Sequence, residues 1–386
     1  MKTSRDRILT THVGSLPRPK ALYDEIVAKE EGRPLDEAVF ERHCSEAIAD
    51  VVKRQVESGI DVVSDGEMSK LAYTLYVRHR LANIVPDERA AKLGREIMVG
   101  RDRLDHPDFF DRNANFTATP FPGCVGPVSY VDKKPLERDL AHLKAAVETA
   151  RPMEAFMTAP SPGILTRFVP NLYYKTEDEY VAALADAMKP EYQAIVAAGF
   201  LLQIDCPDLG SARNNQYRDK TDAEFLKIAE RNVALLNAAT EGLPADHMRL
   251  HICWGNYEGP HTRDIPLTMV AGICLKGRPQ AFSFEGANPR HEHEWEDWKT
   301  IRAPDDKILI PGVIDSTTNF VEHPRLVAQR IARYAGVVGN ERVIAGCDCG
   351  FGTVASGTPM VAPSIMWAKF KALAEGAAMA SKELWR

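Results

Sequence analysis

Eight short apolar runs recur along this 386-residue chain, and each one ends at Gly, Pro, Asp or Ser residues or close to them. They alternate with longer segments in which apolar residues repeat at helical spacing. The runs cover residues 8–13, 61–64, 155–158, 200–204, 249–254, 281–284, 308–314 and 342–345. The main helical candidates cover residues 37–58, 180–198, 221–239, 321–337 and 362–384. Strand and helix alternating eight times predict an α/β chain folded as a (β/α)8 TIM barrel.

An open, doubly wound parallel sheet is the alternative that this alternation leaves. A dinucleotide-binding sheet of that kind carries a Gly-rich turn after its first strand, and nothing resembling that turn follows residues 8–13. Two Thr-x-x-Glu sequences, beginning at Thr176 and Thr221, match capping boxes at the starts of two helical segments. The barrel is therefore the fold that we expect.

Composition excludes several classes of protein. Hydrophobic residues make up 45 % of the chain and charged residues 26 %, and the formal net charge of -6 is spread without a basic block. Because binding to a phosphate backbone needs clustered cationic charge, no nucleic-acid partner is expected. No apolar stretch approaches the roughly 18 residues that cross a bilayer, so no membrane contact is expected. The charged N-terminal residues carry no secretory signal, and we expect a cytoplasmic protein.

Residues 68–153 interrupt the alternation between the second and third strand runs. The stretch is far longer than a single helix needs, and its centre at residues 119–123 has the turn-rich sequence Thr-Pro-Phe-Pro-Gly. We predict one domain over residues 1–386, with residues 68–153 as an inserted arm or subdomain above the barrel mouth. Covering the barrel or forming a homodimer contact is the role that we expect for it.

Candidate metal ligands lie at the strand ends, where the active site of such a barrel forms. His251 and Cys253 are two residues apart in the fifth run, so a strand turns both side chains to one face. Cys347 and Cys349 have the same spacing after the eighth run, and Glu285 follows the sixth. One histidine, one or two thiolates and a carboxylate suit tetrahedral Zn²⁺, with one position left or vacated for a substrate sulfur.

Each of these residues also has a plainer interpretation. A lone histidine or cysteine at a strand end is more often part of the core, and Glu285 alone would be a solvated loop carboxylate. Seven cysteines are an odd number, and a reducing compartment favours metal binding or burial over disulfides. A disulfide between Cys347 and Cys349 is disfavoured because an extended i, i+2 pair lies near or beyond the usual Cα separation of roughly 4.4 to 6.8 Å.

Three further strand ends hold polar groups suited to a small polar molecule. Gly14 and Ser15 offer backbone N–H groups for a carboxylate, and Glu67 and Asp205 suit an ammonium group. Capping a helix is the alternative role for such a residue taken singly. Their joint occurrence at several strand ends of one barrel favours a binding site.

The sequence resembles the cobalamin-independent methionine synthases, specifically their C-terminal catalytic barrel, over nearly the whole chain from Thr10 to the C-terminal helix. The matching motifs are Thr11-His12-Val13-Gly14-Ser15, Asp65-Gly66-Glu67, Gln203-Ile204-Asp205 with Pro207, His251-Ile252-Cys253, Phe284-Glu285 and Asp348-Cys349-Gly350. Their order and spacing make the match specific at the level of the superfamily.

The resemblance implies a set of roles for these residues. A zinc ion would be held by His251, Cys253, Glu285 and Cys349, and Cys349 is favoured over Cys347 because the family's ligand sits in an Asp-Cys-Gly unit. Homocysteine would be held by Ser15, Glu67 and Asp205. The implied activity is zinc-dependent transfer of a methyl group to the homocysteine thiol, giving methionine.

Two departures from the family bear on the methyl donor. The full-length synthases carry an N-terminal barrel that helps to hold polyglutamyl folate, and 386 residues leave no room for one. In the family, a histidine that acts as the acid for the folate leaving group stands shortly after the aspartate of the seventh strand. Here Asp315 is followed by Ser-Thr-Thr-Asn at residues 316–319. We therefore expect a donor other than polyglutamyl folate.

Two alternative functions stay open at this point. The stretch at residues 253–261, Cys-Trp-Gly-Asn-Tyr-Glu-Gly-Pro-His, resembles the shorter relatives, which include the zinc enzyme that joins epoxides to coenzyme M. For such alkyl transfer to another thiol, Arg18 or Arg290 would be the cation that binds the sulfonate. The other alternative is a zinc-binding barrel without catalysis.

Overall fold

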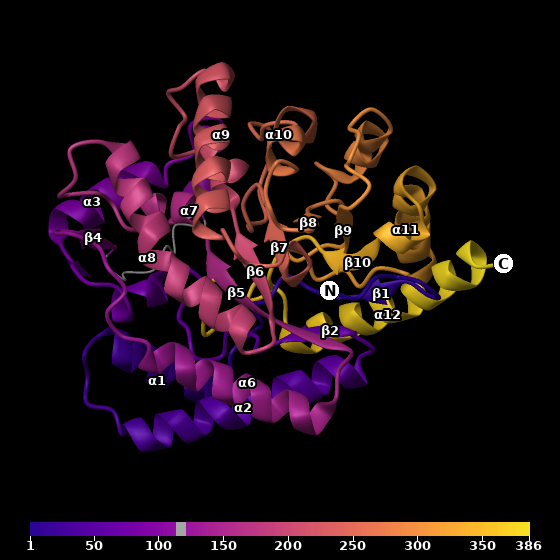
Figure 1. The fold of residues 1–386 in the computed structure, drawn as a ribbon, viewed down its shortest axis with the longest axis horizontal. Helices are drawn as coiled ribbons and strands as arrows, with labels where there is room; N and C mark the ends of the chain where they lie inside the picture. The colour runs from indigo at the N-terminus through magenta and orange to yellow at the C-terminus, as the bar shows by residue number, and fades with distance from the viewer. Residues whose placement is uncertain (113–120) are drawn as a thin grey trace.

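The computed structural model describes residues 1–112 and 121–386, and at its centre eight parallel strands form a barrel (Figure 1). The strands are β1 (Leu9–Thr10), β2 (Val62–Ser64), β5 (Glu154–Pro160), β6 (Leu201–Asp205), β7 (Met248–His251), β8 (Ala281–Phe284), β9 (Ile308–Ile314) and β10 (Ile344–Cys347). They are ordered β1-β10-β9-β8-β7-β6-β5-β2 in the sheet. A parallel bridge between Thr11 and Val62 joins the two outer strands. The predicted TIM barrel is therefore confirmed.

Helices surround the barrel (Figure 1). The long ones are α1 (Lys20–Glu30), α2 (Glu37–Glu57), α6 (Lys134–Ala150), α8 (Glu177–Ala197), α9 (Asp222–Ala239), α11 (Pro324–Val338) and α12 (Pro363–Leu384), and the shorter α7 (Pro162–Phe168) and α10 (Leu267–Cys274) follow β5 and β7. Thr221 and Glu224 form the complete capping box predicted for α9. At α8 only half of the predicted box forms. The Thr176 side chain accepts from the N–H of Glu179, but the Glu179 carboxylate accepts from the N–H of Lys175 at 3.1 Å and not from that of Thr176.

The segment between β2 and β5 has two parts. The first contains an antiparallel hairpin of β3 (Ile84–Pro86) and β4 (Pro122–Cys124) and the helices α3 (Glu88–Ile97), α4 (Arg101–Asp105) and α5 (Pro107–Arg112). The second is α6, which packs along α2 on the outside of the barrel (Figure 1). Within the expected turn-rich centre, residues 119 and 120 lie outside the described residues, and Pro122 begins β4. Since α6 occupies the place of a barrel helix, the additional structure is the part that precedes it.

A layer of buried polar side chains lies inside the barrel beneath the strand ends. The guanidinium of Arg249, 1 % exposed, donates to Gln203 Oε1 at 2.7 Å, to Thr11 Oγ1 at 2.9 Å and to the carbonyl of His12. The same guanidinium lies 3.8 Å from the centroid of the Phe156 ring. These contacts connect β6, β7 and the residues after β1 inside the barrel.

All seven cysteines are buried and free of disulfides. None of the helices in the part of the chain that the structure describes is long and apolar enough to span a membrane.

Candidate metal and substrate site

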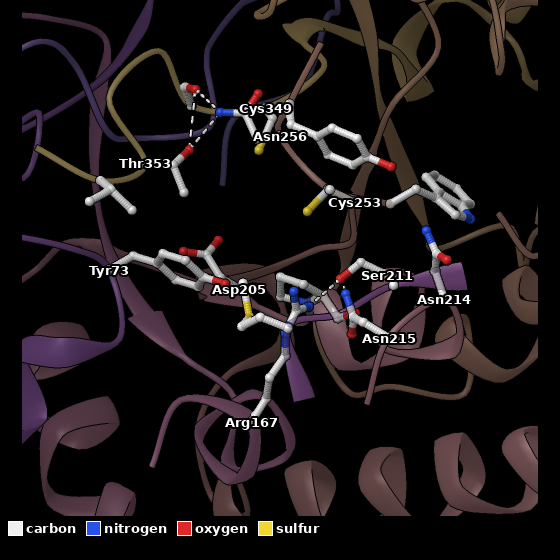
Figure 2. Close-up of a pocket in the computed structure, with 18 of the residues that line it drawn as sticks. Tyr73, Arg167, Asp205, Ser211, Asn214, Asn215, Cys253, Asn256, Cys349 and Thr353 are labelled. Atoms are coloured by element: carbon white, nitrogen blue, oxygen red, sulfur yellow. Dashed lines mark hydrogen bonds between the residues drawn. The ribbon is translucent and has the colours of Figure 1, made fainter. Parts of the chain in front are cut away.

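A cavity of about 450 Å³ opens at the carboxyl ends of the barrel strands. Six of the seven residues proposed from the sequence line it: Ser15, Glu67, Asp205, His251, Cys253 and Cys349. Figure 2 shows the two thiols on one side of this cavity, with Tyr73, Asp205 and Arg167 across from them. Residues that are far apart in the sequence therefore meet at one place.

His251, Cys253 and Cys349 form a compact set of metal-binding atoms, which we call the ligand trio. One ligand atom of each, the two sulfurs and an imidazole nitrogen, lies within 4.8 Å of the others, and all three side chains are buried. His251 ends β7, Cys253 follows two residues later, and Cys349 lies two residues after the end of β10. Because β8 and β9 separate β7 from β10, closure of the barrel is what brings the two cysteines together.

His251 is poised as a neutral ligand. Its Nδ1 lies 3.2 Å from Ser283 Oγ, whereas its buried Nε2 has no hydrogen-bond partner among the described residues. Burial lowers the pKa of His251 to about 3, with the positive charge of Arg249 acting in the same direction. An unprotonated imidazole with a buried, unpartnered nitrogen is the form that binds a metal ion.

The two thiols of the ligand trio influence each other. Hydrogen bonding with the neighbouring Cys349 lowers the pKa of Cys253, and the same interaction raises the pKa of Cys349. One thiolate therefore forms more readily than two, since two adjacent negative charges repel each other in a buried site. A cation placed between the sulfurs would remove that repulsion, which fits a site for a soft divalent metal.

The backbone near Cys349 leaves no room for a larger residue. A Cβ added to Gly350 would lie 2.0 Å from Ser15 Oγ. Ser15 itself is held from the same side, because the N–H of Phe351 donates to its carbonyl oxygen at 2.8 Å. The end of β10 and the loop after β1 therefore approach each other closely, and this contact requires glycine at position 350.

Glu285 lies beside the ligand trio, and both of its carboxylate oxygens accept hydrogen bonds from other groups. Its Oε1 accepts from the backbone N–H of Trp254 at 2.8 Å, and its Oε2 accepts from Asn288 Nδ2 at 2.7 Å. Burial raises the pKa of Glu285 well above its ordinary value. In this structure its carboxylate is thus not part of the compact set and lines a neighbouring hollow instead.

Cys347, the rival of Cys349, turns away from the set. Its Sγ lies 3.0 Å from the carbonyl oxygen of Cys349. Burial raises the pKa of Cys347 to about 12. The thiol is therefore held protonated, and the geometry favours Cys349 as the ligand from this strand end.

Two carboxylates, Glu67 and Asp205, lie on the substrate side of the cavity. Thr158 Oγ1 donates to Glu67 Oε1 at 2.8 Å, and Gln203 Nε2 donates to Asp205 Oδ1 at 2.8 Å. Burial raises the pKa of each, and the charge of Glu67 raises that of Asp205 further. A cationic group between them would stabilise both carboxylates in their charged form.

Arg18, which we considered as a partner for a sulfonate, is already occupied. It donates to Glu67 Oε2 at 3.4 Å and to the backbone carbonyls of Leu16, Gly352 and Lys70. Arg290, the other cation considered, is exposed and lines the neighbouring hollow.

Several residues of the cavity were not identified from the sequence. Tyr73, Met98, Asp102, Phe109 and Phe110 come from the segment between β2 and β5, and Arg167 comes from α7. None of them follows a strand run directly, so the strand-end pattern gave no signal for them. The length of the stretch between the second and third runs was the one available indication that it reaches the barrel mouth.

Asp102 links this segment to the loop after β7. It is 1 % exposed, and its carboxylate accepts from Thr262 N at 3.0 Å, Thr262 Oγ1 at 2.6 Å, Asn214 Nδ2 at 2.9 Å and Tyr257 Oη at 3.2 Å. Asn214 belongs to the loop after β6. One carboxylate thus holds three separate segments around the mouth of the cavity.

No family model matches the chain. The methionine synthase of Saccharolobus solfataricus is 23 % identical over 380 residues, which cover 98 % of this chain and 96 % of that protein. The methionine synthase of Sulfolobus acidocaldarius is 23 % identical over 344 residues, covering 88 % of this chain and 85 % of that protein.

Two solved structures share the fold over nearly the full length of the chain. A B12-independent methionine synthase from Shewanella sp. W3-18-1, in complex with selenomethionine, has a TM-score of 0.73 at 20 % identity and covers 98 % of this chain and 99 % of its own. A putative vitamin-B12 independent methionine synthase from Listeria monocytogenes has a TM-score of 0.64, also at 20 % identity, with the same two coverages.

Proposed function

We propose that this chain, which belongs to the cobalamin-independent methionine synthase family, is a metal-dependent methyltransferase that methylates the thiol of homocysteine to give methionine. The observation on which the proposal rests is the joint presence, in one cavity, of the ligand trio and of the buried acids Glu67 and Asp205. The trio suits a metal and a sulfur, and the acids suit the ammonium group of an amino acid.

Zinc is the metal that this donor set fits best. Two thiolates and one neutral imidazole are soft and borderline ligands, and a tetrahedral zinc site of three protein ligands keeps one position for substrate. When bound, Zn²⁺ would lower the pKa of a thiol from about 8.5 so that the thiolate is present at neutral pH. Glu285 remains our fourth candidate ligand, since its carboxylate lies next to the trio, and it would vacate that position when the substrate sulfur binds.

The chain's own residues would bind and orient homocysteine. Glu67 and Asp205 would hold the ammonium group, and Ser15 with the adjacent backbone would hold the carboxylate. In the reaction the thiol proton is lost to solvent and the new S–CH₃ bond forms as the bond between donor and methyl carbon breaks. The electron pair of that broken bond leaves with the donor, so both atoms and charge balance.

A donor other than polyglutamyl folate is part of the proposal. Asp315, at the end of β9, accepts hydrogen bonds from the backbone N–H groups of Thr317 and Thr318 and forms an ion pair with Lys369 at 3.6 Å. No histidine occurs at residues 316–319, where the resemblance implies the one that would protonate a folate leaving group.

Metal content and substrate binding test the proposal separately. We expect about one zinc per chain in the wild type, and loss of most of it in Cys253→Ser and Cys349→Ser. Cys347→Ser is the matched control, because it removes a buried thiol two residues from Cys349 and should retain the metal. Zinc that is absent from the wild type, or retained in both ligand variants, would refute the metal site.

Calorimetry with homocysteine tests the acid pair on zinc-loaded protein. Glu67→Gln and Asp205→Asn should each weaken homocysteine binding by at least tenfold while zinc content stays unchanged. Methionine formation should then be assayed with methylcobalamin, methylfolate and simple methyl thioethers as donors in parallel. Unchanged homocysteine affinity in both variants would refute the assignment of the ammonium site.

A further inference from the structure

Arg167 is a buried cation with most of its hydrogen-bonding capacity unused. It lies in the last turn of α7 with 7 % of its surface exposed, and it lines the cavity that holds the ligand trio. Its Nη1 donates to Ser211 Oγ at 2.9 Å, and its buried Nε has no partner among the described residues. A guanidinium carries five N–H donors, so a single hydrogen bond leaves this group far from satisfied.

Among the described residues, other buried arginines have more hydrogen-bond partners than Arg167. Arg80 binds the carboxylates of Asp139 at 2.5 Å and Glu191 at 2.9 Å. Arg330 lies 3.2 Å from the carboxylate of Glu292, and Arg249 donates to three acceptors from three of its nitrogens. For Arg167, the described residues place no carboxylate oxygen within ion-pair distance.

An unpaired guanidinium in such a position is costly unless an anion completes it. Burying a charge without a partner is strongly unfavourable, and planar guanidinium groups are well suited to bind the two oxygens of a carboxylate. Burial lowers the pKa of Arg167. Figure 2 shows its side chain reaching into the cavity, beside Ser211 and Asn215.

The residues around Arg167 indicate the chemistry of the molecule that would bind there. Apolar side chains line the cavity near the barrel mouth: Met98, Phe109, Phe110, Phe168, Val354 and Met360. The cavity volume of about 450 Å³ lies within the range of roughly 300 to 1,000 Å³ that is typical of small-molecule sites. In our proposed function the homocysteine carboxylate is held by Ser15, which leaves Arg167 for the second substrate.

We infer that Arg167 binds an oxyanion group, a carboxylate or a sulfonate, on the methyl donor, and that the donor is a small organic acid with an apolar body. Asn215, on the loop after β6, lines the same cavity and lies beside Arg167 (Figure 2). Arg167 acts as a specificity residue in this arrangement, because it selects the donor by charge. The inference rests on the proposed function, since it assigns the donor of that reaction.

Matched probes that differ only in charge test the inference. The protein should be loaded with zinc and titrated calorimetrically with 3-(methylthio)propanoate and with its neutral amide, each with and without homocysteine. A third probe, 2-(methylthio)ethanesulfonate, distinguishes a sulfonate from a carboxylate. We expect the wild type to bind at least one of the two acids at least tenfold more tightly than the amide. Equal affinities for acids and amide in the wild type would overturn the inference without any variant.

Variants then locate the preference on Arg167. Arg167→Gln should lose the preference for acids. Arg167→Lys keeps the charge and should retain part of the preference, and it serves as the test if Arg167→Gln does not fold. Arg290→Gln removes the exposed rival arginine and should keep the preference in full. Transfer of the effect to Arg290, or a preference that survives in both Arg167 variants, would overturn the inference.

Two further readouts separate this inference from the proposed function. Zinc content and homocysteine affinity should be unchanged in Arg167→Gln. Loss of zinc would mean that Arg167 supports the thiolate of Cys253, and loss of homocysteine binding would mean that it holds the homocysteine carboxylate; either result overturns the inference. Absence of zinc and of homocysteine binding in the wild type would instead refute the proposed function, while the acid preference without homocysteine would still be measurable.

Discussion

The backbone N–H of Trp254, the residue that follows Cys253, donates to Glu285 Oε1 at 2.8 Å. A carboxylate at the end of β8 thereby fixes the chain that leaves β7, at the point where that chain presents a thiol to the cavity. The indole of Trp254 is held from its other side, since His291 stacks on it with ring centroids 4.1 Å apart and Nε1 donates to the carbonyl of Ile265 at 2.6 Å. The position of the Cys253 sulfur thus depends on a neighbouring strand.

Replacing Glu285 should separate its positioning role from its charge. In Glu285→Gln the amide oxygen still accepts from Trp254 N, and only the hydrogen bond from Asn288 is lost, so stability should fall by about 0.5–1.5 kcal/mol. Zinc affinity should fall by about 10- to 100-fold. Glu285→Ala also leaves that N–H unpaired, which should cost a further 1–3 kcal/mol or so of unfolding free energy. Urea unfolding and zinc competition titrations measure the two effects. Equal stability of the two variants would contradict the positioning role.

Removing zinc should destabilise the protein. An ion that binds only the folded state, at a free concentration of about 100 times its dissociation constant, adds roughly 2.7 kcal/mol of stability. Treatment with a chelator should therefore lower the melting temperature, and added Zn²⁺ should restore it. Cys253→Ser should show the low value with or without chelator. A wild-type melting temperature that is insensitive to chelator would argue against a structural contribution of the metal.

Loss of the Asp102 carboxylate should loosen the mouth of the cavity. Asp102→Ala leaves the buried amide of Asn214 without its acceptor, which costs about 1–3 kcal/mol, and also removes the acceptor of the part-buried N–H and O–H groups of Thr262. We expect lower stability and faster tryptic cleavage near Arg101 and Arg103, read by mass spectrometry. Asp108→Ala, at an exposed position on α5, is the control and should behave as the wild type. Equal cleavage rates in the two variants would exclude the link that we describe.

A histidine beside the site should make stability fall at alkaline pH. Burial acts to lower the pKa of His291, but hydrogen bonds to Asp264 and Glu294 outweigh it and raise the pKa to about 10. Its contribution is fully present below pH 6.5 or so, where the unfolded histidine is also protonated, and is lost as pH rises towards 10. Urea unfolding between pH 6 and 10 should show this decline.

The matched variants for this decline are His291→Gln and His247→Gln. The first removes the buried histidine, so the decline should be reduced. The second changes a histidine whose side chain is 43 % exposed and should leave the decline intact. An identical pH dependence for His291→Gln and the wild type would mean that other groups cause the loss of stability.

Periodicity alone was sufficient for the barrel. Residues 281–284 and 308–314 were predicted as strands with the same bounds that β8 and β9 have, because short apolar runs that end in Gly or Asp carry a strong local signal. The ligands at strand ends could be proposed for the same reason, since topology brings those ends together. The role of Glu285 could not be resolved, because a carboxylate that accepts a backbone N–H has the same sequence signature as one that binds a metal.

Residues placed by long-range packing could not be predicted. Arg167 lies on a short helix after β5, and nothing in its local sequence indicates that no carboxylate pairs with it. The four hydrogen bonds of the Asp102 carboxylate join parts of the chain more than 100 residues apart. Long-range packing also decides the place of α6: we expect an inserted arm or subdomain over residues 68–153, and within that stretch α6 packs against α2 on the outside of the barrel.

The order of strands in the sheet has a consequence for the biogenesis of the protein. β10 pairs with β1 and is followed two residues later by Cys349, whereas His251 and Cys253 accompany β7. A nascent chain that has not yet passed residue 349 holds only part of the ligand trio. The complete metal site would therefore form only after the last strand has been synthesised. Bound zinc would then indicate that the barrel has closed.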